Sequence, residues 1–359
     1  YPTDIGMWND GRMDAWNTAR APGYGMGYFE WSDLPYYYAL ADAFTVGDAH
    51  FQSTFTQTCP NRMHLFAGAN NNLWNAAGRN ASGAVFDMMD NTEPTPGFSW
   101  PTVAETLEEA GVSWHVYQEE DNFDDNGFAW FDTFQRAKPG EPLYDKGLAR
   151  LPTDTLVDAF ADAVGNKTLP HVSFIIAPAH LSEHATNHPS AGEDLTARLM
   201  AVLSAPANAG VYAKTAVILN YDEGGQFFDH HWTPTPPQSP PHDGQSTVET
   251  TGEITAAERV GVSAGTPIGL GFRVPLIIIS PWTRVASGGA VYSEVVDHTS
   301  IIQFIEKRFA VHCPNISPWR RAVTGDLTAA FDFESPPDYS WPQMPNTSAF
   351  VAKAEWDCE

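Results

Sequence analysis

The stretch VILNYDEGGQFFD occupies residues 217–229 and joins an apolar run to a polar turn. Its first part, 217–221, is typical of a buried strand and stops at two adjacent carboxylates, Asp222 and Glu223, with two glycines beyond. An open α/β sheet presents ligands for a metal or a substrate at the carboxyl ends of its strands in this way. Turns made of acids and glycines are also common on protein surfaces, so the stretch alone leaves a solvated turn open.

Helical patterns and apolar runs alternate on both sides of this stretch. Thr102 and Glu105 have the spacing of a capping box, which begins a helix that Gly111 ends. Further helices are expected at 34–45, 154–164, 192–204 and 299–309, and further strands at 112–117, 171–179 and 272–280. Alternation of helices with continuous apolar strands predicts an α/β fold, with a mostly parallel central sheet covered by helices on both faces.

The length of 359 residues, with 43% hydrophobic and 13% aromatic residues, fits a single domain with a large core, here expected to span residues 1–359. Residues 1–35 show no clear period and are expected to form loops and short turns. Large loop insertions are expected as an excursion at 69–98, a rim or lid loop at 232–264 and a surface-wrapping tail at 326–359, because these segments are rich in Pro, Gly, Ser or Asn.

The formal net charge of −25 argues against nucleic acid as a partner and against electrostatic docking on anionic membranes. No apolar run approaches the ~20 residues that span a bilayer, and the longest, VPLIIIS at 274–280, has the size of a strand. An integral membrane segment is therefore not expected.

Several features favour a secreted, glycosylated protein. The chain begins with Tyr1-Pro2-Thr3, which is neither an initiator methionine nor a signal peptide, so it looks processed or cut. Asn-x-Ser/Thr sequons occur at Asn80, Asn166, Asn315 and Asn346. Of the three cysteines, Cys313 and Cys358 are one possible disulfide pair, which leaves Cys59 free or joined to something else.

Nucleophile-elbow, Walker A, dinucleotide-binding and zinc-protease motifs are absent, which leaves three polar clusters at expected strand ends. Thr58 lies in the loop 56–62 beside an expected helix start, where backbone N–H groups favour a phosphate. His180 and His184 follow the strand 171–179, and Asp222 with Glu223 forms the third cluster.

Adjacent parallel strands would bring the second and third clusters to one edge of the sheet. The two carboxylates can hold a hard cation, the Thr58 hydroxyl can be activated on it, and a histidine can protonate a leaving oxygen. Structural alternatives stay open: a purely structural role for Thr58, a surface i,i+4 pair for His180 and His184, a satisfied polar turn for 229–231, and a solvated face for the acidic stretch 119–126.

Nine stretches in order between about residues 8 and 333, among them TQTCPNR, APAHLSEH, YDEGGQFFDHHW, STVETTGEI and VVDHTSIIQFIEKRF, carry a family resemblance. The chain resembles the phospholipase C/acid phosphatase phosphoesterase family, and within it the non-haemolytic, phosphatidylcholine-type phospholipase C branch. The resemblance implies an alkaline-phosphatase-like core and hydrolysis of a phosphoester through a metal-bound hydroxyl.

Residue by residue, the resemblance makes Thr58 the nucleophile and a metal contact, Asp222 and Glu223 metal ligands, and His184 the histidine of a Ser-Glu-His motif. Asn61 and Arg62 complete the nucleophile motif and are expected to bind substrate. The cofactor is expected to be one divalent ion, with Ca²⁺, Mg²⁺ or Mn²⁺ suited to oxygen ligands and Zn²⁺ left open by nearby histidines. Thr56-Gln57 replaces the family's Gly-Pro, so the loop is expected to differ in shape.

Family members begin with a strand that ends in Glu-Asn-Arg-Ser-Phe-Asp-His, and no such segment occurs in this chain. A parallel sheet that lacks a central strand is not expected to be stable alone. We therefore expect the N-terminal strand to exist outside this chain, as a separately cleaved segment or an omitted one.

The expected function is a secreted, metal-dependent phospholipase C that converts phosphatidylcholine-like phospholipids to diacylglycerol and a phosphorylated headgroup. One alternative is an acid phosphatase on the same scaffold, which would prefer simple phosphate monoesters. Another alternative is an inactive glycoprotein that binds a ligand through the old pocket.

Overall fold

The computed structural model describes residues 2–19, 25–70, 97–185, 187–225, 227–237, 245–255, 263–286, 288–348 and 351. Its largest sheet has the order β5 (Val217–Asn220), β6 (Leu276–Ile279), β1 (Thr45–Gly47) and β7 (Ala290–Tyr292). Two smaller sheets pair β3 (Trp114–Tyr117) with β4 (Val172–Ile175), and β2 (His50–Phe51) with β8 (Val296–Asp297). Among these strands β6 runs antiparallel to both of its neighbours, and the other three pairings are parallel.

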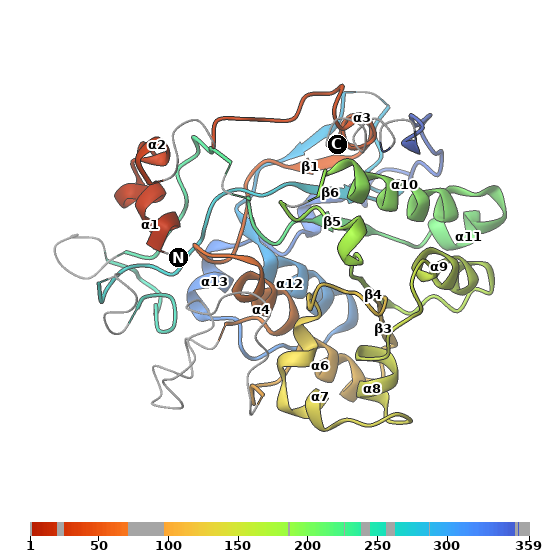
Figure 1. The fold of residues 1–359 in the computed structure, drawn as a ribbon, viewed down its shortest axis with the longest axis horizontal. Coiled ribbons are helices and arrows are strands. Elements are labelled where there is room, and N and C mark those ends of the chain that lie inside the picture. The colour runs from red at the N-terminus through yellow and green to blue at the C-terminus, as the bar shows by residue number, and fades with distance from the viewer. Residues whose placement is uncertain are drawn as a thin grey trace.

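Helices cover both faces of the largest sheet, as Figure 1 shows. On one face lie α4 (Thr58–Ala67), α6 (Val103–Glu109) and α12 (His298–Phe309), which pack through apolar side chains against Leu276 and Ile278. On the other lie α3 (Pro35–Ala43), α9 (Leu156–Gly165) and α10 (Ser190–Ser204), which pack against Ile277 and Ile279. Because successive side chains of β6 point to opposite faces, this buried strand serves both core layers. The predicted α/β class is confirmed.

The helix starts follow from local capping. The Thr102 hydroxyl accepts from the Glu105 amide at 3.2 Å, and the Glu105 carboxylate accepts from the Thr102 amide at 2.8 Å, so the predicted capping box is confirmed. A second box starts α12, where Asp297 accepts from the Thr299 amide at 3.0 Å. The predicted helices at 154–164, 192–204 and 299–309 correspond to α9, α10 and α12 within two residues at each end.

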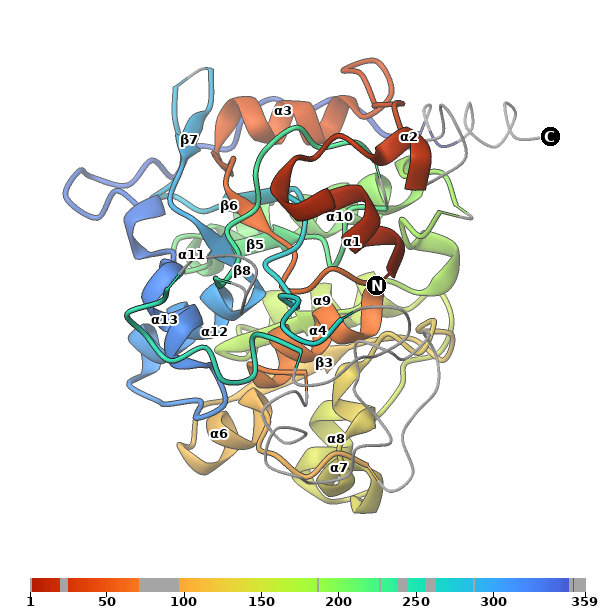
Figure 2. The same ribbon diagram turned by 90° about the vertical axis from the view of Figure 1, so that its left-hand side faces the viewer.

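The prediction of loops and turns for residues 1–35 is wrong for its first part. This segment contains α1 (Pro2–Trp8), the 3₁₀ turn η1 (Asn9–Gly11) and α2 (Trp16–Ala19), which Figure 2 shows from the side that carries them. Met7, Trp8, Met13 and Trp16 are buried against Phe55 and Phe272. The helices are too short to show a period in the sequence, and contact between their large apolar side chains stabilises them instead.

The remaining elements are short and connect these layers. They are η3 (Gly127–Trp130), α7 (Asp132–Arg136), α8 (Pro142–Gly147), η4 (Ala179–Leu181), η5 (Pro206–Asn208), α11 (Ala209–Tyr212), α13 (Pro318–Val323) and η6 (Thr328–Ala330). Most of the predicted excursion, 71–96, lies outside the described residues, as do 238–244 and 256–262 of the rim loop. In the tail, Trp341 and Met344 pack against the core layer of α3, α9 and α10. No described helix is both long and apolar enough to cross a bilayer.

A gap separates β4 from β5. Val172 and Phe174 of β4 pack into the same core layer as Ile218 of β5, so the strands belong to one layered structure. Within the described residues, however, β4 pairs only with β3 and β5 only with β6. Both strands are only half-buried, and Ile175 is 36% exposed, whereas β6 is buried throughout.

Candidate active site

Thr58 is the first residue of α4 and is 9% exposed. The preceding Gln57 has extended backbone, and its side chain forms no capping hydrogen bond. The Gln52 side chain donates to the carbonyls of Thr54 and Thr56, at 2.6 and 3.2 Å, and so fixes the loop that leads to Thr58. The Thr58 hydroxyl therefore lies at a helix start, as the sequence predicted, and its role in binding an anion stays a prediction.

Asn61 shapes the same loop from within. Its amide nitrogen donates to the carbonyls of Thr56 and Gln57 at 2.9 and 3.0 Å, and its oxygen accepts from the Thr54 amide at 2.8 Å. The residue is fully buried. Because both amide hydrogens are donated to the loop, Asn61 positions the loop and has no N–H left for the substrate contact that we predicted.

Arg62 joins α4 to two other segments. Its Nε donates to Asp222 at 2.9 Å, Nη1 donates to the Asp125 carbonyl at 2.9 Å, and Nη2 pairs with the Asp125 carboxylate at 3.0 Å. Burial works against the charge, but the two carboxylates outweigh it and raise the pKa of Arg62. Since Thr58 and Arg62 stand four residues apart on a helix, this contact places Asp222 on the Thr58 side of α4.

The turn after β5 is tied to the Thr58 loop a second time. The Gly224 amide donates to the Gln52 side-chain oxygen at 3.0 Å, so one glutamine contacts both segments. Within the turn, the Glu223 amide donates to Asp222 at 3.0 Å, and the Gly225 amide donates to Glu223 at 2.6 Å. The predicted carboxylate turn thus lies beside the predicted nucleophile loop.

The histidine cluster reaches the same edge through Glu183. The Glu183 carboxylate accepts from the hydroxyls of Tyr37 and Tyr221, at 2.5 and 2.6 Å, and Tyr221 directly follows β5. Burial raises the pKa of Glu183 to about 7, although both tyrosine hydrogen bonds oppose the shift. The neighbouring His184 ring lies 4.9 Å from the Phe123 ring, in the loop that also carries Asp125. The segments that follow β3, β4 and β5 therefore meet, although within the described residues β4 and β5 are not paired with each other as the sequence predicted.

Two other candidate groups, His180 and the segment 229–231, make structural contacts. His180 is half-exposed and lies 3.4 Å from Asp154, a surface pair rather than part of the site. In the segment 229–231, Asp229 binds the Arg273 guanidinium at 2.8 Å and the His231 amide at 3.0 Å, as in a satisfied polar turn.

The solvated-face interpretation of 119–126 holds for the exposed Glu120, Asp121 and Asp124 but is wrong for two other acids. Glu119 is buried and accepts the Leu156 amide at 2.9 Å at the start of α9, while Asp125 binds Arg62. A run of acidic residues does not indicate which of them binds a helix start or an arginine, so the contacts of Glu119 and Asp125 could not be predicted from the sequence. Gln52, Tyr37, Asp125 and Glu183 were likewise missed, because their importance depends on contacts between distant segments.

A fully buried polar cluster lies behind the Thr58 loop. Arg320 of α13 binds Glu253 at 2.9 Å and Asp297 at 2.5 Å, and also donates to the Ser53 carbonyl at 2.9 Å. The Ser53 hydroxyl donates to Asp297 at 2.8 Å. Burial would raise the pKa of Asp297, but Arg320 and the Thr299 hydroxyl outweigh it and lower the pKa to about 2.

The carboxylate turn alone does not make a metal site. Asp222 already accepts from Arg62 and from the Glu223 amide, and Glu223 accepts from the Gly225 amide. Over the described part of the chain, no group of three or more His, Cys, Asp or Glu side chains has an arrangement that could hold a metal ion. A hard cation with six or more oxygen ligands would need further donors beside this turn.

The predicted modification sites differ in accessibility. Asn166 and Asn346 are exposed, and Asn80 lies outside the described residues. Asn315 is buried, and its amide donates to the carbonyls of Ala67 and Pro101 at 2.9 and 2.6 Å, so a glycan there would require both bonds to break.

The predicted disulfide also reaches beyond the described residues. Cys313 is buried and forms no disulfide within the described residues, and Cys358 lies outside them.

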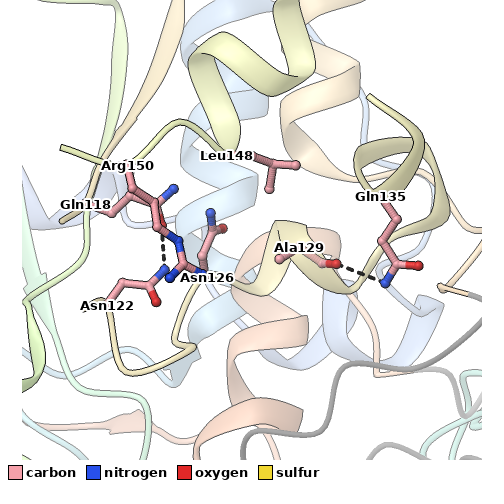
Figure 3. A pocket seen from close by; sticks show the side chains of 7 residues that line it. All are labelled: Gln118, Asn122, Asn126, Ala129, Gln135, Leu148 and Arg150. Carbon is pink, nitrogen blue, oxygen red and sulfur yellow. Dashed lines mark hydrogen bonds between the residues drawn. The ribbon is translucent and has the colours of Figure 1, made fainter. Parts of the chain in front are cut away.

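A polar pocket of about 270 Å³ opens elsewhere, between β3 and α7, as Figure 3 shows. Its side chains mostly bind one another or nearby carbonyls: Asn122 donates to Gln118 at 2.7 Å, and Gln135 donates to the Ala129 carbonyl at 3.1 Å. The lining residues are Gln118, Asn122, Asn126, Ala129, Gln135, Leu148 and Arg150. No carboxylate or histidine lies in this lining, and hydrogen bonds of Asn122 and Asn126 to Gln118 and to the Gly147 carbonyl support the loop that carries Asp125.

The fold and site define an α/β protein in which a hydroxyl at a helix start, a carboxylate turn and a histidine loop meet at one sheet edge. The chain belongs to the phosphoesterase family, whose model matches residues 1–312.

Curated relatives extend this match. A protein of Burkholderia pseudomallei named non-haemolytic phospholipase C is 42% identical over 96% of this chain and 50% of its own length. A haemolytic phospholipase C of Pseudomonas aeruginosa is 43% identical over 92% of this chain and 46% of its own length. Phospholipase C B of Mycobacterium tuberculosis is 38% identical over 95% of this chain and 65% of its own length. The chain thus spans about half the length of the first two relatives.

Among solved structures, a Vibrio parahaemolyticus protein of the alkaline phosphatase superfamily matches with a TM-score of 0.40 and 12% identity, over 82% of this chain and 64% of the other. Similarity of this size has no bearing on function.

Proposed function

We propose that this chain carries the active site of a phospholipase C-type phosphodiesterase that acts on phosphatidylcholine-like lipids. The observation that carries the proposal is the meeting of the Thr58 loop with the Asp222–Glu223 turn through Arg62 and Gln52. The names of the curated relatives give the substrate class.

In the proposed reaction the Thr58 hydroxyl releases its proton to solvent as its oxygen attacks phosphorus, and the bond from phosphorus to the glycerol oxygen breaks. His184 donates a proton to that oxygen, so diacylglycerol leaves. Water then cleaves the bond between Thr58 and phosphorus, which releases the phosphorylated headgroup and restores the hydroxyl. Arg62 and Gln52 hold the two segments in register for this attack.

Asp222 and Glu223 are proposed as two ligands of one divalent ion that polarises the phosphoryl group when bound. Their acceptor chemistry suits Ca²⁺, Mg²⁺ or Mn²⁺, and Zn²⁺ stays possible through a histidine. Elemental analysis of the purified protein tests this: about one equivalent of a divalent metal is expected, with less in Asp222→Asn. A protein that is fully active in excess chelator would contradict it.

Thr58→Ala tests the role of the hydroxyl. We expect hydrolysis of phosphatidylcholine to fall by a factor on the order of 10³ or more, because the reacting oxygen is removed, and Thr58→Ser to keep a substantial part of it. Thr153→Ala removes an exposed hydroxyl and serves as the matched control. Equal turnover in Thr58→Ala and the wild type would overturn the assignment.

The same assay separates the alternative functions. Faster hydrolysis of a phosphate monoester than of a choline phosphodiester would favour an acid phosphatase. An intact preparation with neither activity nor metal would favour an inactive binding protein.

We also propose that an extended segment, cleaved from the same precursor, lies between β4 and β5 in the working protein. Val172 and Ile176 donate backbone bonds towards β3, so by alternation the amides of Ser173 and Ile175 point into the gap. The carboxyl end of a strand parallel to β4 and β5 would lie beside Asp222 and could supply the further oxygen ligands.

Hydrogen exchange tests this segment on the protein as purified. With the strand in place, the amides of Ser173 and Ile175 should be protected to the same degree as those of buried β6. Mass spectrometry with and without reduction should reveal the second polypeptide. Two results together would contradict the proposal. These are exchange of the Ser173 and Ile175 amides as fast as that of loop amides, and a mass spectrum with a single species that corresponds to this chain and its glycans.

Export is proposed from the sequons, since two of them, Asn166 and Asn346, are exposed. Treatment with peptide N-glycosidase should lower the mass of the natural protein, and Asn166→Gln/Asn346→Gln should remove most of that shift. A natural protein whose mass is unchanged by the enzyme would count against glycosylation.

A further inference from the structure

Large aromatic side chains are exposed on two neighbouring segments, 25–31 and 227–232. Tyr28 is 79% exposed, Trp31 59% and Trp232 55%, and Phe227 and Phe228 are 44% and 39% exposed. We call these five residues the aromatic rim. Contiguous exposed patches of this kind usually mark a surface that meets a partner or a membrane.

The two segments form one surface. The Phe228 amide donates to the Gly25 carbonyl at 2.6 Å, and the rings of Phe29 and Phe227 lie 5.8 Å apart. Phe228 also contacts the buried Trp16 of α2, with ring centroids 5.6 Å apart. The rim is therefore anchored on the core beneath α1 and α2, on the side of the molecule that faces the viewer in Figure 2.

The aromatic rim adjoins the candidate active site through its segment 227–232. The Phe227 amide donates to the Gly224 carbonyl at 3.2 Å, so the rim begins where the carboxylate turn ends. Phe55, three residues before Thr58, lies in the core beneath the rim and contacts Trp8 and Phe272. A surface that docks on the rim is thereby held against the entrance to the Thr58 loop.

The charge around the rim restricts what it can bind. Segments 25–38 and 222–237 contain no Lys or Arg but include Glu30, Asp33 and Asp229, and the whole chain carries −25. Anionic lipid would be repelled, whereas a zwitterionic surface presents no net charge to oppose contact. Trp and Tyr are the side chains that prefer the boundary between headgroups and acyl chains.

We propose that the aromatic rim docks this face onto zwitterionic phospholipid bilayers and presents the active site to lipid in the membrane. The inference rests on the proposed phospholipase function for its choice of partner. It adds a binding step that uses insertion of aromatic side chains instead of basic residues, which the segments 25–38 and 222–237 lack.

The test measures vesicle binding in a Thr58→Ala background, so that no lipid is consumed. Flotation with phosphatidylcholine vesicles is compared with flotation using phosphatidylglycerol vesicles. We expect stronger binding to the former and a loss on the order of 10- to 100-fold in the partition coefficient for Tyr28→Ser/Trp31→Ser, which removes two apolar groups from contact. The matched control, Phe333→Ser/Tyr339→Ser, changes two similarly exposed aromatics in the tail and should bind like its parent.

Several results would overturn the inference. These are equal binding by the rim variant and its parent, tighter binding to phosphatidylglycerol, and no binding to either vesicle. Sedimentation in the same buffer tests a second copy of the chain as the occupant, and a dimer that dissociates in the rim variant would also overturn it.

The two proposals fail separately. Rim-dependent vesicle binding by a protein whose wild type does not hydrolyse lipid would remove only the proposed function. Hydrolysis of lipid with rim-independent binding would remove only the docking inference.

Discussion

Two arginines of this chain each bind two carboxylates from distant segments, yet their surroundings differ. Arg320 and its partners Glu253 and Asp297 are 0–4% exposed, and every contact of this cluster is made inside the protein. Arg62 is 21% exposed, and one of its carboxylates is 26% exposed. The first arginine therefore holds segments together, while the second does so at a surface that a substrate can reach.

The difference in burial separates ion pairs that only stabilise the fold from ion pairs that a bound ligand can reach. Both clusters are connected to the loop 52–57. Arg320 donates to the Ser53 carbonyl in the interior. On the Arg62 side, the Gly224 amide of the carboxylate turn donates to Gln52, whose side chain donates to the Thr54 carbonyl. A buried charge that is fully paired fixes a backbone position. A partly exposed one keeps some freedom to respond to a bound phosphate or metal.

Removal of the buried arginine should have the largest effect on stability. Arg320→Met leaves two enclosed carboxylates without a partner, so we expect a loss of about 3–5 kcal/mol in the free energy of unfolding. Urea denaturation measures it. Arg198→Met, at a surface i,i+4 pair, is the control and should change stability by less than about 1 kcal/mol. Similar values for the two variants would erase the distinction drawn between the clusters.

Removal of the exposed arginine should act on activity instead. For Arg62→Met we expect lipid hydrolysis to fall on the order of 10²-fold, because the Thr58 loop and the carboxylate turn lose their register. Stability should fall by less than in Arg320→Met, since water still reaches Asp222, which is 26% exposed. Steady-state kinetics and denaturation on the same preparation give both numbers, and unchanged kinetics would contradict the role of Arg62.

Acid should weaken the buried cluster in a defined pH range. The folded-state pKa of Asp297, about 2, lies below its usual 3.8, so its contribution is present above pH ~4 and is lost as the pH falls towards 2. The shift corresponds to about 2 kcal/mol. Asp297→Asn should flatten this part of the stability profile, while Asp132→Asn, at an exposed pair, should not. A wild-type profile that is flat between pH 4 and 2 would contradict the assignment.

The sequence predicted the elements that depend on local patterns. The capping box at Thr102, the buried run of β6 and the carboxylate turn at Asp222 are readable because neighbouring residues specify them. The residue pattern also singled out Thr58 and His184, the resemblance to a known family assigned their roles, and the structure brings both to the edge where Asp222 lies.

The rest depends on contacts between segments far apart in the chain. Nothing beside Gln52 in the sequence shows that its amide joins the Thr58 loop to Gly224, 172 residues later. Asp125 looks like one acid in a solvated run until Arg62 is seen against it. The short helices α1 and α2 escape detection because their stability comes from rings contributed by other segments.

The most direct measurement of the central claim is the identification of the atom that becomes attached to phosphorus during turnover. The intact protein is mixed with a choline phosphodiester, quenched in acid within one turnover and digested for mass spectrometry. The account predicts a phosphorylated headgroup on the peptide that contains Thr58, with none on that peptide in Thr58→Ala. Turnover that leaves Thr58 unmodified, or an adduct on another residue, would contradict it.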